Sequence, residues 1–82
     1  MGRHVVYVLE CGDGSLYTGY TTDLERRVTE HEAGEGAKYT RGRGPFRVVH
    51  RESFGSRGAA LSREASIKAL SRTEKERLVT SS

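Results

Sequence analysis

Five side chains in this sequence carry the functional groups that the hydrolysis of a phosphodiester bond would require. These residues are Tyr7, Tyr17, Arg27, His31 and Glu64. A phenol or an imidazole can take a proton from water, a guanidinium can neutralise a phosphate, and a carboxylate can hold a divalent cation. Each residue type also has a structural explanation, as a core aromatic, a surface charge or one half of an ion pair. The choice depends on the elements that position these side chains.

The start of the chain predicts a β-hairpin. Residues 4–10 are rich in β-branched and aromatic side chains, and a Gly-Asp-Gly turn at 12–14 leads into a returning strand at 16–20. Side chains alternate between the two faces of a strand, but the register of the turn is unknown. The sequence therefore leaves open whether Tyr7 and Tyr17 share a face.

A helix is expected directly after the hairpin. Thr22 and Glu25 have the spacing of a capping box, with Thr22 as the N-cap and Glu25 reaching back to it. The helix should stop at Gly34, because glycine readily takes the backbone conformation that ends a helix. Arg27 and His31 are four residues apart beside a short apolar stripe, so both can point toward the edge of the sheet.

The remainder of the chain predicts one more strand and two more helices. A glycine-rich basic loop at 34–45 precedes a strand at 46–51. Ser56 can cap the next helix, and residues 71–74 form a second capping box that opens a short terminal helix. The order β-β-α-β-α-α predicts an α/β fold of the α+β type, a small three-stranded, mainly antiparallel sheet flanked by helices. The length suits a single domain, 1–82.

Charge is distributed unevenly along the chain. The formal net charge is +3, but residues 1–35 carry a balance of −4 and residues 36–72 one of +7. A basic stretch on an otherwise acidic chain favours an anionic partner such as nucleic acid, although a solvated surface loop would look the same. The residues expected to contact nucleic acid are Lys38, Tyr39, Arg41, Arg43 and Lys68. Tyr39 can stack on a base or pack underneath, and phosphate-dominated binding should be salt-sensitive.

Cysteine content and hydropathy argue against several other classes of protein. Cys11 is the only cysteine, so no internal disulfide can form, and the three histidines are too widely spaced to build a zinc site with it. The longest apolar run, residues 5–9, is far too short to span a membrane, and the N-terminus has no signal-peptide pattern. We therefore expect a cytoplasmic protein with no membrane partner.

Glu64 is the hardest of the five candidates to explain by structure alone. Its helical neighbours at spacings of three and four are Ala60, Leu61, Ile67 and Lys68. Because most of that stripe is apolar, the Glu64 carboxylate should face the core, where it is costly unless it is paired or binds a cation. The structural alternative is a salt bridge to Arg27, Lys68 or another base.

Taken together, these residues resemble the GIY-YIG nuclease superfamily, and most closely its small stand-alone bacterial-type members. Val5-Val6-Tyr7 stands where the family has its GIY tripeptide, and Tyr17-Thr18-Gly19 stands where it has YIG. Both depart from the namesake letters, but the tyrosines and the glycine are retained.

Longer runs extend the resemblance from Val5 to about Leu78. The run YTGYTTDLERRVTEH matches the second tripeptide and the following helix, with the family's arginine at Arg27 and its histidine at His31. The run ALSREASIKAL matches the metal-binding helix, with the family's glutamate at Glu64. The segment GAKYTRGRGP is similar to a stretch typical of the stand-alone members.

The resemblance implies a metal-dependent endonuclease that acts on nucleic acid, expected to be DNA, in repair or recombination. A divalent cation, Mg²⁺ or Mn²⁺, would sit on Glu64 with water and phosphate as its other ligands. Tyr7 or Tyr17 would orient or deprotonate the attacking water, with help from His31. Arg27 would neutralise charge that builds in the transition state. Which tyrosine is the base stays open.

Two other functions are compatible with the same residues. One is a module that binds nucleic acid without cutting it, and the other is an accessory subunit that is active only with a protein partner. A chain of 82 residues has no room for the separate DNA-binding domain that nucleases of this superfamily often have, which would suit either function. The full set of five residues favours the enzyme, because Glu64 would repel phosphate without a metal.

Overall fold

The computed structural model describes residues 3–81, which form an antiparallel sheet and three α-helices. The strands are β1 (His4–Glu10), β2 (Leu16–Thr21) and β3 (Arg47–Phe54), in the spatial order β2-β1-β3. The helices are α1 (Leu24–Glu32), α2 (Arg57–Lys68) and α3 (Arg72–Thr80), with a short 3₁₀ helix, η1 (Lys38–Thr40), in the loop before β3. The predicted α+β fold with the order β-β-α-β-α-α is confirmed.

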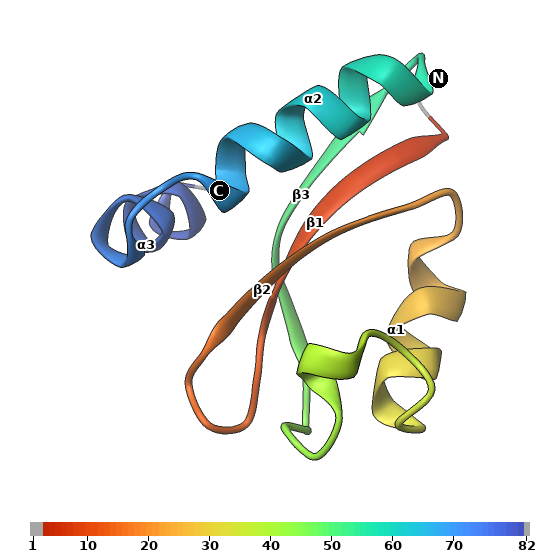
Figure 1. The fold of residues 1–82 in the computed structure, drawn as a ribbon, viewed down its shortest axis with the longest axis vertical. Helices are drawn as coiled ribbons and strands as arrows, with labels where there is room; N and C mark the ends of the chain where they lie inside the picture. The colour runs from red at the N-terminus through yellow and green to blue at the C-terminus, as the bar shows by residue number, and fades with distance from the viewer. Residues whose placement is uncertain (1–2, 82) are drawn as a thin grey trace.

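Strand β1 forms the centre of the sheet, and its two rows of side chains face different layers. A cluster of fully buried side chains joins one row to α2 and consists of Val6, Val8, Ala60 and Ile67. Burial of each of the larger of these side chains contributes about 1.5–3 kcal/mol of transfer free energy. Tyr7, between the two valines, points to the opposite face and contacts α1. Figure 1 shows α2 and α3 on one side of the sheet and α1 with the η1 segment on the other.

Helix α1 has a different N-cap from the predicted one. Asp23 is the N-cap, and its carboxylate accepts a hydrogen bond from the backbone N–H of Arg26. The predicted capping box of Thr22 and Glu25 is therefore wrong. Both Thr and Asp are good N-cap residues, and the aspartate, which ranks higher, has the role. The rest of the helix is unaffected by the shift.

Strand β3 ends at Phe54 rather than at residue 51, as the sequence predicted. It pairs with the whole length of β1, and Phe54 lies opposite His4. Residues 52–53 are Glu-Ser, which have little intrinsic preference for a strand, so pairing with the buried central strand accounts for the extension.

The caps of the last two helices are as predicted. Ser56 accepts a hydrogen bond from the backbone N–H of Ala59 at the start of α2. Ser71 and Glu74 form a reciprocal capping box at the start of α3. None of the helices within residues 3–81 has the length and apolar character needed to cross a membrane.

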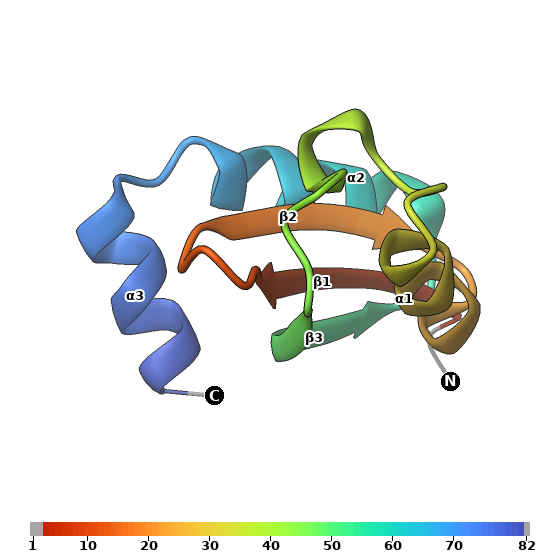
Figure 2. The same ribbon diagram turned by 90° about the horizontal axis from the view of Figure 1, so that it is seen from below.

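The basic loop between α1 and β3 is folded onto the sheet. In Figure 2 it runs across the face that also carries α1. The loop is tied to the hairpin turn by a hydrogen bond from the Gly12 N–H to the carbonyl oxygen of Arg43, and by an ion pair between the Arg43 guanidinium and Asp13. These contacts bring the loop next to α1 and the tyrosines of the hairpin.

Candidate active site

Tyr7 lies in the middle of β1, directly opposite Gly19 of β2. A Cβ atom at position 19 would lie 2.5 Å from the Tyr7 hydroxyl oxygen and 3.0 Å from a ring carbon of Tyr17. Glycine therefore lets the Tyr7 phenol extend over the backbone of β2, an edge strand of the sheet. The glycine of the second tripeptide thus makes room for the tyrosine of the first.

Tyr7 and Tyr17 share one face of the sheet, which settles a point that the sequence left open. Their ring centroids are 6.4 Å apart. The Tyr17 ring also meets His31 edge-on at 5.4 Å and stacks on Tyr39 at 5.9 Å. Tyr7 is only 1% exposed, whereas Tyr17 is half-buried. A large ligand at this face would therefore contact Tyr17 more readily than Tyr7.

His31 is a buried member of α1 and has a hydrogen-bond partner for each ring nitrogen. Its Nε2 lies 2.9 Å from the hydroxyl oxygen of Tyr7, and its Nδ1 lies 2.8 Å from the hydroxyl oxygen of Thr40. Burial lowers the pKa of His31, and the nearby Arg27 guanidinium lowers it further. The imidazole is therefore neutral at neutral pH, with one nitrogen that donates and one that accepts.

The surroundings of the Tyr7 phenol favour its protonated form. Burial raises the pKa of Tyr7 to about 12, and the Tyr17 and Glu64 side chains act in the same direction. The Arg27 guanidinium acts in the opposite direction, through a hydrogen bond and its charge. Arg27 comes from α1 and Glu64 from α2, so both helices contribute charge to the environment of this one phenol.

Arg27 is held on α1 by a carboxylate of the same helix. Its guanidinium donates to Glu30 at 3.0 Å, and Glu30 also accepts from Arg26 at 3.4 Å. The Arg27 side chain is 31% exposed and the Arg26 side chain 75%, so Arg27 is the more enclosed of the two. Arg27 and His31, which the spacing predicted to point toward the edge of the sheet, both lie beside the Tyr7 phenol.

Glu64 is less deeply buried than the apolar stripe predicts. Its side chain is 17% exposed and forms an ion pair with Lys68 at 3.2 Å, which is one of the structural alternatives that the sequence left open. Ala60 and Ile67 are fully buried, but Leu61 is exposed, so only part of the predicted stripe faces the core. The carboxylate lies at the border of the core, where its charge reaches Tyr7.

The chemistry of Glu64 fits a weakly held magnesium-type ion. Within residues 3–81 there is no group of three or more His, Cys, Asp or Glu side chains placed to hold a metal. Mg²⁺ is commonly held by one or two carboxylates, with water and substrate phosphate as the remaining ligands. A single half-buried carboxylate is compatible with such an ion, whereas it would not suit a structural zinc site.

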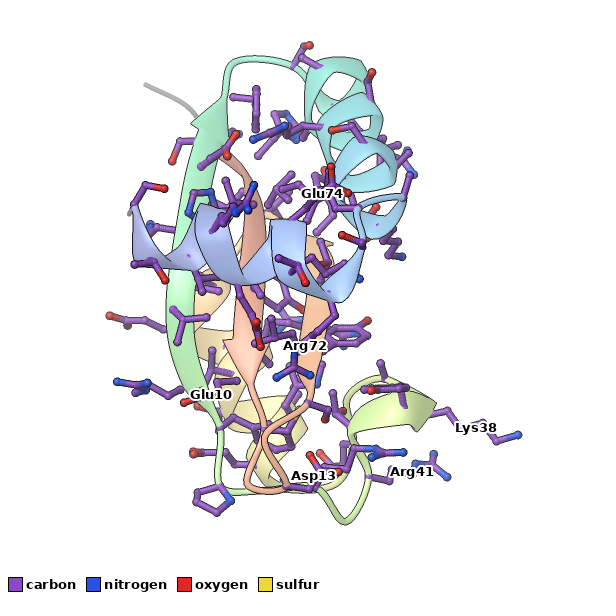
Figure 3. All side chains as sticks on the ribbon, turned by 90° about the vertical axis from the view of Figure 1, so that its left-hand side faces the viewer. Glu10, Asp13, Lys38, Arg41, Arg72 and Glu74 are labelled. Atoms are coloured by element: carbon purple, nitrogen blue, oxygen red, sulfur yellow. The ribbon has the colours of Figure 1, made fainter. Side chains whose placement is uncertain are left out.

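The residues predicted to contact nucleic acid divide into two groups. Lys38 and Arg41 extend outward from the η1 segment, away from the rest of the molecule (Figure 3). Arg43 turns back, and its guanidinium carbon lies 4.4 Å from the centre of the Tyr39 ring. Tyr39 also stacks on Tyr17 and is 46% exposed, so stacking on a base and packing within the loop both stay predictions.

A surface cavity of about 270 Å³ lies beside Tyr17. The residues that line it are Leu16, Tyr17, Thr18, Tyr39, Lys68 and Lys75. Two lysines, one from α2 and one from α3, therefore border a hollow next to one of the candidate phenols.

Lys75, Thr40 and Glu30 were not predicted as members of the site. Their contacts depend on how the helices and the loop fold, and no local pattern in the sequence indicates them.

Comparisons with known proteins match nearly the whole chain. The GIY-YIG catalytic domain model matches residues 3–77. The UPF0213 protein of Natronomonas pharaonis is 67% identical over 76 residues, which cover 93% of this chain and 89% of that relative. The UPF0213 protein of Halalkalibacterium halodurans is 58% identical over 78 residues, which cover 95% of this chain and 83% of that relative.

Two solved structures are similar to this chain. The solution NMR structure of a UPF0213 protein from Bacillus halodurans has a TM-score of 0.62 and 58% identity, covering 94% of this chain and 82% of that chain. The solution NMR structure of a protein from E. faecalis has a TM-score of 0.65 and 49% identity, covering 95% of this chain and 83% of that chain.

Proposed function

Because the chain belongs to the GIY-YIG catalytic domain family, we propose that it is a divalent-metal-dependent endonuclease. Its substrate would be DNA, in repair or recombination, and residues 1–82 would act as a single catalytic domain. The observation that carries the proposal is the buried hydrogen bond between Tyr7 and His31. The charges of Arg27 and Glu64 both act on the Tyr7 phenol.

Tyr7 is the proposed general base, and His31 is the proposed acceptor of its proton. A phenol becomes a base only after it has lost its own proton, and Nε2 of His31 lies 2.9 Å away to receive it. The phenolate then takes a proton from the attacking water. As the new P–O bond forms, the bond to the leaving oxygen breaks, and the proton on His31 returns to the leaving oxygen or to solvent.

This proton transfer is unfavourable in the free protein. Burial raises the pKa of Tyr7 to about 12 and lowers the pKa of His31, so the neutral pair is strongly preferred. Positive charge next to the phenol stabilises the phenolate, and Arg27 supplies such a charge, but the same guanidinium disfavours protonation of His31. We therefore expect the base to form only in the complete complex with substrate.

Glu64 would hold the divalent cation. When bound, such a cation polarises the scissile phosphate and stabilises the leaving oxygen. Lys68, which is 3.2 Å from the carboxylate in the free protein, would then be released to contact a phosphate. Tyr17, half-buried beside the lysine-lined cavity, would contact the substrate and orient it.

The outward-pointing basic residues would bind the phosphate backbone. Lys38 and Arg41 extend outward for direct contact, while Arg43 packs on the ring of Tyr39 within the loop. Such contacts release counterions, so we expect affinity to fall with salt by a log–log slope of roughly a few units.

One observation favours the second candidate function, a nucleic-acid-binding module or a subunit that is activated by a protein partner. In the free protein Tyr7 is only 1% exposed, and Glu64 is neutralised by Lys68. If neither side chain is released when DNA binds, the protein would bind the phosphate backbone without cleaving the DNA.

Nicking of supercoiled plasmid and of a branched DNA distinguishes the two candidates. The reactions are run in Mg²⁺, Mn²⁺ and EDTA with the wild type, Glu64→Ala and the control Glu76→Ala, whose ion pair lies on α3. An endonuclease would cut only with metal and would lose cutting in Glu64→Ala while retaining it in Glu76→Ala. Salt-sensitive binding without cutting by any of the three proteins would favour the binding module.

A further inference from the structure

Thr40 joins the buried Tyr7–His31 pair from the basic loop. It is the last residue of η1 and is buried, and its hydroxyl oxygen makes two hydrogen bonds. One partner is Nδ1 of His31 at 2.8 Å, and the other is the carbonyl oxygen of Ala37 at 2.8 Å. A loop residue thus contacts the side of the imidazole that faces away from Tyr7.

These two contacts fix the position of one proton. A carbonyl oxygen can only accept, so the single hydroxyl hydrogen of Thr40 points to Ala37. In its contact with His31, the Thr40 hydroxyl oxygen is therefore the acceptor. Nδ1 of His31 must be the donor and must carry a hydrogen. A neutral imidazole has only one N–H, so Nε2 is left with a free lone pair that faces the hydroxyl of Tyr7.

We infer that Thr40 is a positioning residue that keeps His31 in the Nδ1–H tautomer, so that Nε2 can accept the proton of Tyr7. The inference rests on the proposed function, in which that proton transfer creates the base. In the other tautomer the lone pairs of Nδ1 and Thr40 would face one another, and Nε2–H could not accept a proton.

The loop that carries Thr40 is built against the imidazole. Gly36 lies so close to His31 that any Cβ atom at position 36 would collide with the Nδ1 atom. The ring of Phe46, at the end of the loop, has its centroid 5.9 Å from that of His31. Gly36, Thr40 and Phe46 thus surround one side of the ring and leave it little freedom to turn.

The test is the tautomer of His31, measured from the side-chain ¹⁵N chemical shifts of the full chain. The variants are Thr40→Val, which keeps the shape but loses the acceptor, and Thr40→Ser, which restores it. Thr73→Val, at the exposed start of α3, is the control. Wild type, Thr40→Ser and Thr73→Val should have the hydrogen on Nδ1. Thr40→Val should lose this preference, and its kcat for DNA cleavage should fall roughly 10- to 100-fold with little change in KM, as expected for partial loss of a proton acceptor.

An Nε2–H tautomer in the wild type would overturn the inference, and so would an unchanged tautomer and kcat in Thr40→Val. If Thr40→Val fails to fold, the wild-type and Thr40→Ser spectra still decide where the proton lies. The tautomer is measured without substrate or metal. Lack of cleavage by the wild type would therefore count against the proposed endonuclease, while an Nδ1–H signal that depends on the Thr40 hydroxyl would still support the placement of the proton.

Discussion

Each face of the sheet carries a tyrosine that is hydrogen-bonded to a histidine. On one face the Tyr7 hydroxyl oxygen lies 2.9 Å from Nε2 of His31, and on the other the Tyr20 hydroxyl oxygen lies 2.8 Å from Nδ1 of His4. The two pairs have the same functional groups and nearly the same distance. Their surroundings differ, and the difference shows what a candidate site requires beyond the residue types.

The Tyr20–His4 pair is part of the packing of the sheet. Its rings are stacked with planes 9° apart, and Tyr20 packs against the apolar cluster under α2. The Tyr7–His31 rings meet at 64°, and the imidazole has a second hydrogen bond to Thr40. A buried phenol with a proton acceptor, a neighbouring cation and a nearby carboxylate can exchange protons, whereas a stacked pair mainly contributes packing.

Among variants that keep both Tyr–His pairs chemically intact, Gly19→Ala should have the largest effect, and only on the Tyr7 side. The new methyl group would lie 2.5 Å from the Tyr7 hydroxyl, so the phenol must move away from His31. Displacement of a catalytic group by about 1 Å can cost roughly 10²-fold in rate, and overpacking costs about 1–3 kcal/mol of stability. Cleavage assays and thermal unfolding measure the two effects. Gly55→Ala, where a Cβ meets nothing within 4 Å, is the matched control, and equal losses in both variants would contradict the assignment.

Arg27→Ala should have the next largest effect. Loss of one positive charge beside the developing phosphate charge typically lowers kcat roughly 10²-fold. Arg26→Ala is the control, because Arg26 shares the Glu30 partner but is the more exposed of the two. Single-turnover cleavage by the two variants separates the roles. A similar rate for both would place Arg27 among the ordinary surface charges of α1.

Acid should weaken the fold through His31, with a smaller effect. Because the folded pKa of His31 is lowered, the unfolded chain binds a proton more readily as the pH falls below about 6.5. The stability from neutral His31 is therefore complete above that pH and is lost as the pH falls through the folded pKa. The Tm of the wild type should drop between pH 7.5 and 5.5 by more than that of His31→Gln. An equal drop in His31→Gln would contradict this explanation.

Much of the fold follows from local signals in the sequence. The hairpin turn, the serine caps and the Ser71–Glu74 capping box are all present as predicted. The errors have specific causes. Two adjacent residues, Thr22 and Asp23, can both cap α1, and the sequence does not decide between them. The end of β3 depends on pairing with β1, which is a long-range contact that propensity does not include.

The candidate site is predictable in its residue types but not in its connections. The ion pair of Glu64 with Lys68 follows from their helical spacing. The hydrogen bond between Tyr7 and His31 joins residues 24 positions apart, and the Thr40 contact requires the loop to fold back on α1. These contacts depend on tertiary packing, which spacing along the chain does not determine. The catalytic and nucleic-acid-binding roles of the site residues stay predictions.

The most direct test of the central claim compares Tyr7→Phe with Tyr20→Phe in single-turnover cleavage of a branched DNA with Mg²⁺. Each variant removes one hydroxyl from one Tyr–His pair and keeps the ring, and circular dichroism checks that both proteins fold. Tyr7→Phe should cut roughly 10²- to 10⁴-fold more slowly than the wild type, as expected for loss of a general base, and Tyr20→Phe should cut at nearly the wild-type rate. Equal rates for the two variants, or a loss confined to Tyr20→Phe, would contradict the assignment of the reaction to the Tyr7 face.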